Sequence, residues 1–244
     1  MGAEPNRMMG RLGWDFFDKI YCITLDSRPD RMTAAKREFA AVGLDQRIEF
    51  ISVAKDRENP ARGIFHSHMR CLTRGLEAGA RHILVFEDDI IFRGLSEERL
   101  RQAGLFLRET GTWDAFFLGC ISNGSRPTPQ DAVVRVKYRC LAHGYALNRP
   151  YAERLVGEQW RGLPFDGLLH RCHGHFFALK PMCAFQGVTS SDNETIWIDR
   201  MRNLFGGLPF IQRCNEIYQN NKKLILALHL LVAAVALVYF FLVR

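Results

Sequence analysis

The stretch Ile83-Leu84-Val85-Phe86-Glu87-Asp88-Asp89 decides the fold of this chain, because a continuous apolar run turns abruptly into three carboxylates. An uninterrupted apolar run is typical of a strand that is buried on both faces of a parallel sheet. Ligands of open α/β sheets bind outside the carboxyl ends of such strands. Neighbouring carboxylates repel one another, and a hard divalent cation relieves that repulsion. The stretch therefore indicates either a site for a metal and a phosphate or a solvated turn.

On both sides of this stretch, short apolar runs alternate with helical patterns, which predicts an α/β domain with a mostly parallel sheet flanked by helices. The expected strands are 20–25, 47–53, 83–86, 113–118, 133–137 and 145–147, and the expected helices are 31–42, 63–79, 96–108 and 150–156. Residues 122–130 contain Asn, Gly and two Pro, and we expect a loop there. A less regular region is expected up to about residue 203.

The composition allows one substantial domain and excludes few classes of protein. The chain has 244 residues and a formal net charge of +7, but its 26 acidic residues are interspersed among 33 basic ones, which does not favour nucleic-acid binding. Phosphate-bearing substrates or an anionic membrane surface account for the basic excess equally well. The seven cysteines are odd in number and scattered, so we expect reduced and mostly buried thiols.

The two ends of the chain have contrasting compositions. Residues 1–19 carry charges and lack the apolar stretch of a secretory signal, so we expect no entry into the secretory lumen by that route. Residues 224–243 carry no formal charge, and a helix of this length spans roughly 30 Å, the hydrocarbon thickness of a bilayer. We therefore predict a catalytic domain at 20–205, a linker at 206–223 and a transmembrane anchor at 224–243. Lys222 and Lys223 precede the anchor and only Arg244 follows it, which places the domain in the cytoplasm.

Six blocks of the chain, in the same order, resemble glycosyltransferase family 25, which includes lipooligosaccharide galactosyltransferases and procollagen galactosyltransferases. The resemblance runs roughly from Ile20 to Asn193. Its blocks are 23–31 (the Leu-x-x-Arg-x-x-Arg start), 63–68 (Gly-Cys-x-x-Ser-His, with Ile64 in place of Cys), 84–89 (the Glu-Asp-Asp strand end), 113–119, 144–147 and 163–166. Each block is weak alone, and the specificity lies in their common order.

The resemblance implies a GT-A nucleotide-diphosphosugar fold, a UDP-sugar donor that is often UDP-galactose, and inversion at the anomeric carbon. On this reading Asp89 is the direct ligand of Mn²⁺ or Mg²⁺, Glu87 is a nearby carboxylate that contacts the donor or the metal, and Asp88 supports them. The acceptor would be a hydroxyl of a glycan, a lipid-linked glycan or a protein, as in lipopolysaccharide biosynthesis. The bound metal would stabilise the charge that develops on the departing diphosphate.

Four further residues are candidates for donor binding. Arg28 and Arg31 follow the first strand and could hold the diphosphate or the ribose by paired hydrogen bonds, or they could lie on a solvated helix face. Ser67 and His68 match the family's helix, although a helical histidine beside a sheet is often structural. Neighbouring helix residues point about 100° apart, so this pair is not the nucleophile and base of a hydrolase.

An inverting transferase also needs a base that takes the proton of the acceptor hydroxyl. Asp166 follows Leu163-Pro164-Phe165 and is expected in an apolar loop that raises its pKa. Asp192 competes for this role, and either residue could simply cap a helix or a turn. The cluster of His170, Cys172, His173 and His175 lacks a second pair of ligands at the spacing of a zinc site.

Two other functions stay open on the sequence alone. The chain could be a membrane-anchored binding module that keeps the fold without catalysis, although Glu87 and Asp89 argue against that. It could also be another phosphate-handling α/β enzyme. A phosphatase of the haloacid dehalogenase type would need an Asp-x-Asp-x-Thr arrangement after the first strand, which Asp26-Ser27-Arg28 does not supply.

Overall fold

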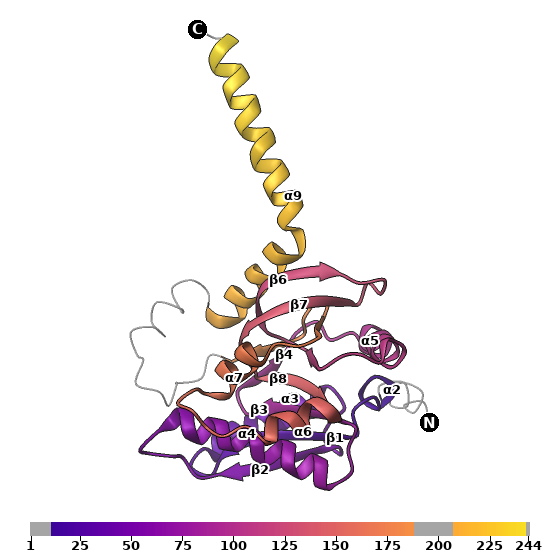
Figure 1. Ribbon diagram of the computed structural model, residues 1–244, viewed down its shortest axis with the longest axis vertical. Coiled ribbons are helices and arrows are strands. Elements are labelled where there is room, and N and C mark those ends of the chain that lie inside the picture. The colour runs from indigo at the N-terminus through magenta and orange to yellow at the C-terminus, as the bar shows by residue number, and fades with distance from the viewer. Residues whose placement is uncertain (1–10, 188–206, 243–244) are drawn as a thin grey trace.

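The structure is a computed structural model that describes residues 11–187 and 207–242 (Figure 1). In chain order its elements are α2 (Arg11–Trp14), β1 (Lys19–Leu25), α3 (Pro29–Ala41), β2 (Ile48–Val53), α4 (Pro60–Glu77), β3 (His82–Glu87), β4 (Ile90–Phe92), α5 (Glu97–Thr110), β5 (Ala115–Phe117), β6 (Ile121–Pro127), β7 (Val133–Cys140), β8 (Gly144–Asn148), α6 (Arg149–Val156), α7 (Phe165–Cys172), β9 (Phe176–Leu179), β10 (Ala184–Gln186) and α9 (Gly207–Leu242).

The domain is built on one mixed sheet of eight strands in the order β2-β1-β3-β8-β5-β9-β7-β6. Strands β1, β2 and β3 are parallel to one another, and β8 inserts antiparallel between β3 and β5. Strand β7 is antiparallel to both of its neighbours, so β7 and β8 run against the direction of the other strands. A short ribbon of β4 and β10 lies outside this sheet. The α/β class predicted from the sequence is confirmed, with β7 and β8 as the departures from a parallel sheet.

Alternate side chains of the central strand β3 enter two hydrophobic cores, one on each face of the sheet. Ile83 and Val85 join one cluster with residues of α4, α6 and α7, whereas Leu84 and Phe86 join the other with Phe39 of α3 and residues of α5. This is the burial on both faces that the apolar run predicted. The strand can therefore project polar groups only at its ends.

The loop expected at 122–130 is wrong, because most of this segment forms the edge strand β6. Its pairing with β7 shifts register between Ile121 and Ser125, which accommodates Asn123 and Gly124 as an irregularity of the strand. Pro127 ends the strand at the edge of the sheet, where a missing backbone donor is tolerated. The turn-forming residues of this segment predict a loop, whereas its pairing with β7 makes it a strand.

The domain boundaries also differ from the prediction. Trp14 and Phe17 are buried, so the described end of the predicted N-terminal segment, up to residue 19, belongs to the domain. The expected linker at 206–223 contains, from residue 207, the first half of the continuous helix α9. Gln212 and Glu216 in this half are buried against the domain.

The second half of α9 extends away from the domain, as the yellow helix in Figure 1 shows. The helix is long and apolar enough to cross a membrane, and none of its most apolar 18-residue window is buried. A core helix of the same composition would be covered by protein. The described residues therefore contain one candidate membrane span, which is the apolar half of α9.

Gly119 tests how tightly α9 is joined to the sheet. A Cβ at this position would collide with the carbonyl oxygen of Ala184 and would lie 2.7 Å from Nε2 of Gln212. We expect Gly119→Ala to lower the free energy of unfolding by about 1–3 kcal/mol or more, since this backbone has no room to yield. Gly124→Ala is the matched control, because its Cβ would meet only the Lys137 side chain at 3.7 Å or beyond. Chemical denaturation of both variants in detergent checks this, and equal midpoints would contradict it.

Candidate functional site

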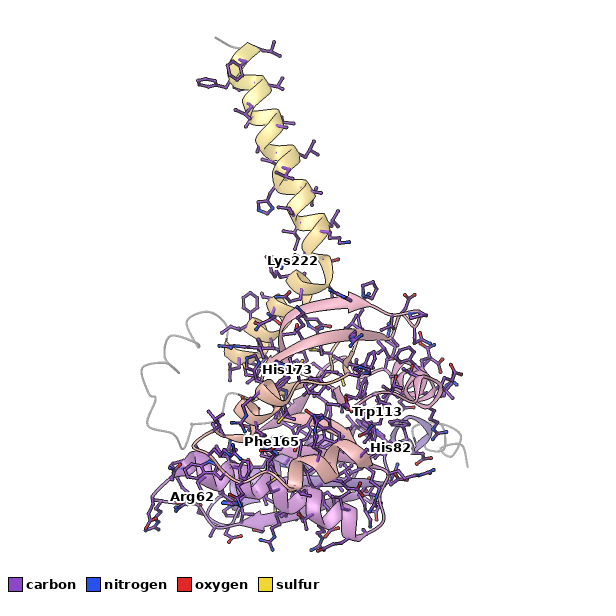
Figure 2. All side chains as sticks on the ribbon, in the orientation of Figure 1. Arg62, His82, Trp113, Phe165, His173 and Lys222 are labelled. Carbon is purple, nitrogen blue, oxygen red and sulfur yellow. The ribbon has the colours of Figure 1, made fainter. Side chains whose placement is uncertain are left out.

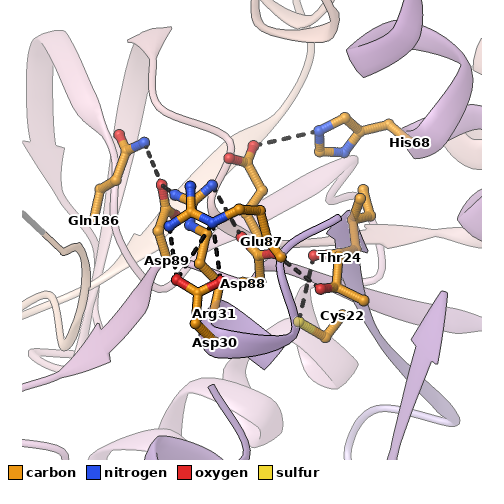
Figure 3. A network of polar contacts seen from close by, with 11 residues as sticks. Cys22, Thr24, Asp30, Arg31, His68, Glu87, Asp88, Asp89 and Gln186 are labelled. Carbon is orange, nitrogen blue, oxygen red and sulfur yellow. Dashed lines mark hydrogen bonds and ion pairs between the residues drawn. The ribbon is translucent and has the colours of Figure 1, made fainter. Parts of the chain in front are cut away.

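The three carboxylates lie where β3 ends, beside the carboxyl end of the parallel strand β1 (Figure 3). Asp88 and Asp89 are each 7% exposed, so the alternative of a solvated turn does not hold for them. Thr24 of β1 donates its hydroxyl to Oδ2 of Asp88 at 2.9 Å. Arg31 of α3 contacts both residues, with 3.4 Å to Oδ1 of Asp88 and 3.0 Å to Oδ2 of Asp89. The first turn after β1 thus supplies the positive charge that these carboxylates need.

Asp89 is held on one oxygen and left open on the other. Its Oδ2 accepts hydrogen bonds from Arg31 at 3.0 Å and from Nε2 of Gln186, at the end of β10, at 2.7 Å. Its Oδ1 is buried and has no hydrogen-bond partner among the described residues. Burial raises the pKa of Asp89, and the charge of Glu87 adds to the effect. A buried acceptor without a donor is costly, so this oxygen is the natural contact for a cation or a ligand.

Glu87 is the partly exposed member of the three and faces His68 of α4. Nε2 of His68 lies 3.4 Å from Oε1 of Glu87, and Nδ1 lies 2.9 Å from the hydroxyl of Tyr145. Phe165 stacks on the imidazole with 4.3 Å between ring centroids. Burial lowers the pKa of His68 to about 4, so the ring is neutral at pH 7. Because Tyr145 can donate to Nδ1, the hydrogen on Nε2 is free to point at Glu87 and orient it.

Although the Glu87 side chain is 31% exposed, desolvation of its carboxyl group by the surrounding protein raises its pKa to about 7, and the next cause is the negative charge of Asp166. Asp166 lies in the first turn of α7 and not in the expected loop. Its two oxygens accept hydrogen bonds from the Tyr138 hydroxyl at 2.7 Å and from the backbone N–H of Leu141 at 2.9 Å. The predicted base therefore lies within electrostatic range of Glu87, and its two hydrogen bonds fix it in place.

Two residues of the site, Gln186 and His143, were not foreseen from the sequence. His143 is buried directly before β8, where its backbone oxygen accepts from the N–H of Glu87 at 3.2 Å. Its Nε2 donates to the oxygen of Ala184 at 3.1 Å, and Nδ1 has no partner among the described residues. No sequence signal marks Gln186. The only hint of His143 is its place next to the block at 144–147.

The other predicted residues contact neighbours in their own turn or helix, or lie outside the described residues. Arg28 pairs with Asp30 of the same turn at 2.9 Å. Ser67 donates its hydroxyl to the oxygen of Gly63, one turn earlier in α4, at 2.7 Å. Asp192 lies outside the residues that the structure describes. Its role stays a prediction.

The carboxylates can be tested as ligands of the divalent cation that the family resemblance implies. In residues 11–187 and 207–242 no three His, Cys, Asp or Glu side chains converge on one point. The zinc reading of the cluster around His170 gains no support there. Mg²⁺ and Mn²⁺, however, need only one or two carboxylates when substrate phosphates complete the shell. The open Oδ1 of Asp89 fits this requirement, with Glu87 as the second candidate ligand.

Comparison with known proteins yields only distant structural likenesses. No protein-family model matches the chain, and no curated protein sequence matches it. A197 from STIV is similar at 10% identity over 70% of this chain and 85% of that chain, with a TM-score of 0.44. A mannose-1-phosphate geranyltransferase from Thermus thermophilus is 12% identical over 66% of this chain and 73% of that chain, with a TM-score of 0.41. A putative glucose-1-phosphate thymidylyltransferase from Bacillus anthracis is 12% identical over 88% and 82%, with a TM-score of 0.42. None of the three identifies a reaction for this chain.

Proposed function

We propose that the chain is a metal-dependent, inverting glycosyltransferase that moves a sugar, galactose in the first instance, from a UDP-sugar to an acceptor hydroxyl. The observation that carries the proposal is the open Oδ1 of buried Asp89, at the carboxyl end of β3 beside Arg31. Strand ends of this kind are where α/β sheets bind ligands. The order of the family 25 blocks supports the same reading.

In this proposal each group near β3 has a separate task. Asp89 and Glu87 hold the cation, which would act as a Lewis acid on the departing diphosphate. Arg31, fixed by Asp88 and Asp89, offers a guanidinium to the phosphate oxygens. His68 keeps Glu87 oriented without adding charge, since burial holds its pKa low.

Transfer itself needs one bond made and one broken. The acceptor oxygen attacks the anomeric carbon on the face opposite the diphosphate, and the bond between that carbon and the diphosphate oxygen breaks with its electron pair going to UDP. Asp166 takes the proton of the acceptor hydroxyl. Asp192 is the alternative base.

Donor profiling tests the reaction class. The purified full chain is incubated with UDP-galactose, UDP-glucose and UDP-N-acetylglucosamine, with Mn²⁺ and with a chelator, and released UDP is measured. We expect metal-dependent release from one donor above the others. A second incubation supplies a nucleoside triphosphate and a sugar 1-phosphate, and release of diphosphate there without release of UDP from the sugar donors would identify a nucleotidyltransferase. If no donor is turned over and UDP binds without metal, the result would favour a binding module without catalysis.

We also propose that α9 anchors the domain to a membrane with the catalytic body on the cytoplasmic side. The apolar half of α9 is uncovered by protein, and Lys222 and Lys223 stand directly before it. The positive-inside bias supports this orientation.

A further inference from the structure

A cavity apart from the candidate site lies where the domain meets the apolar half of α9. It has a volume of about 1360 Å³ and is lined by β6, β7, the end of α7 and residues 219–224 of α9. Figure 2 shows Lys222 where α9 leaves the domain and His173 below it in the body of the domain. The cavity is separate from the open oxygen of Asp89, but Tyr138 lines it and donates its hydroxyl to Asp166.

The described lining of this cavity is basic and contains no carboxylate. Its cationic residues are Arg126, Arg135, Lys137, Lys222 and Lys223. None of the five takes part in a salt bridge within residues 11–187 and 207–242. In a domain with 26 acidic residues, uncompensated cations around one cavity indicate an anionic ligand.

The register of the sheet brings two of these cations face to face. Arg126 of β6 is the direct cross-strand partner of Arg135 of β7, so both side chains project from the same face. Like charges directly opposite each other on a sheet are destabilising. Two guanidinium groups side by side form a site for phosphate oxygens, which they can hold by paired hydrogen bonds.

The position of the cavity selects the kind of anion. Residues 219–224 span the transition from the packed half of α9 to its exposed apolar half, so the cavity lies level with the surface of a bilayer that α9 crosses. Polar groups of the same helix join it to the cavity wall, where Ser125 donates to Asn220 at 2.7 Å. Tyr138, Phe176 and Leu224 add apolar surface to the lining. A ligand here would meet cations and lipid together.

We propose that this cavity binds the phosphate or diphosphate headgroup of a membrane lipid. The further assignment of that lipid as the carrier of the sugar acceptor rests on the proposed glycosyl transfer. The binding site itself does not depend on the reaction.

Binding of farnesyl diphosphate to the full chain in a neutral detergent tests the proposal, with inorganic diphosphate and farnesol as the other probes. We expect farnesyl diphosphate to bind at least tenfold more tightly than inorganic diphosphate, and farnesol to show no saturable binding. Removing the paired guanidinium groups in Arg126→Gln/Arg135→Gln should weaken that binding by about tenfold or more, because charge-assisted hydrogen bonds are lost. Arg37→Gln/Arg81→Gln removes two exposed charges elsewhere and should change it less than twofold.

UDP binding in the presence of Mn²⁺, measured on the same samples, separates this proposal from the proposed function. Equal affinity for inorganic diphosphate would show a site for free phosphates, and unchanged affinity in a folded Arg126→Gln/Arg135→Gln protein would show that the cavity is not the site. Either result overturns the proposal while leaving UDP binding intact. If the unmodified protein binds farnesyl diphosphate but shows no Mn²⁺-dependent binding of UDP, the proposed function alone is overturned.

Discussion

Replacing Asp89 by Asn is expected to abolish detectable sugar transfer and to weaken Mn²⁺-dependent UDP binding. The substitution keeps the shape of the side chain but removes a full negative charge from the oxygen that would face the cation. A ligand whose effect is greatest on the developing charge of the transition state is lost most heavily in turnover. Isothermal titration of UDP with and without Mn²⁺, together with a transfer assay, measures both effects.

The fold should survive this substitution. Burial raises the pKa of Asp89, which means that the protein disfavours its charged form, and Arg31 keeps Asp88 as a partner. The melting temperature should therefore be unchanged or slightly higher. Asp30→Asn is the matched control, because it removes an exposed carboxylate that pairs with Arg28 on the same side of the sheet. If metal-dependent UDP binding is unchanged in a folded Asp89→Asn protein, the carboxylates have only a structural role as an ion-pair network.

Replacing Asp166 by Asn should lower turnover by about 10² or more with little change in donor affinity, because general-base catalysis contributes roughly 10²–10⁴-fold. Its structural cost is small. The side-chain oxygen of Asn can accept from the N–H of Leu141, and its amide can donate to the Tyr138 hydroxyl, which is able to reverse its role. Steady-state rates over a range of donor and acceptor concentrations separate turnover from binding.

Tyr138→Phe provides the control for this substitution, since it removes one hydrogen bond to Asp166 and leaves the carboxylate. We expect it to lower turnover far less than Asp166→Asn does. Asp192→Asn should also have the smaller effect. If Asp192→Asn is the more damaging of the two, the roles of the two aspartates are exchanged.

The core of the candidate site could be predicted because its signal is local. An apolar run that ends in carboxylates locates both a buried strand and the edge at which it opens, and Arg31 follows from the turn after β1. Gln186 and His143 could not be predicted, because they reach the site through the pairing of β10 with β4 and of β8 with β3. Neither pairing leaves a periodic trace in the sequence.

The difference between local and long-range signals also explains where the structure departs from the predicted fold. Strands with buried faces, such as β1 and β3, can be predicted from their apolar composition. Strand β6 cannot, because it is an edge strand with an irregular register against β7. Its other contacts are with α9, about ninety positions away, such as those of Ser122 with Asn215. The first half of α9 was read as a linker for the same reason, since its polar residues are buried by specific hydrogen bonds and not by an apolar stripe.

The unbroken course of α9 would fix the distance between a membrane and the candidate site. A helix of 36 residues is about 54 Å long, and its first half is fixed to the domain where Gln212 bonds to Ala184 and Glu216 to Met182. The helix is continuous between the part that contacts the domain and the part that would lie in lipid. Gln212 and His143 both donate to the carbonyl of Ala184, and the backbone oxygen of His143 in turn accepts from the N–H of Glu87. The helix is thus connected to Glu87 through Ala184 and His143. On the proposed function, a bilayer around the apolar half of α9 would set the height and tilt of the carboxylates above its surface, and only acceptors that extend to that height would be glycosylated.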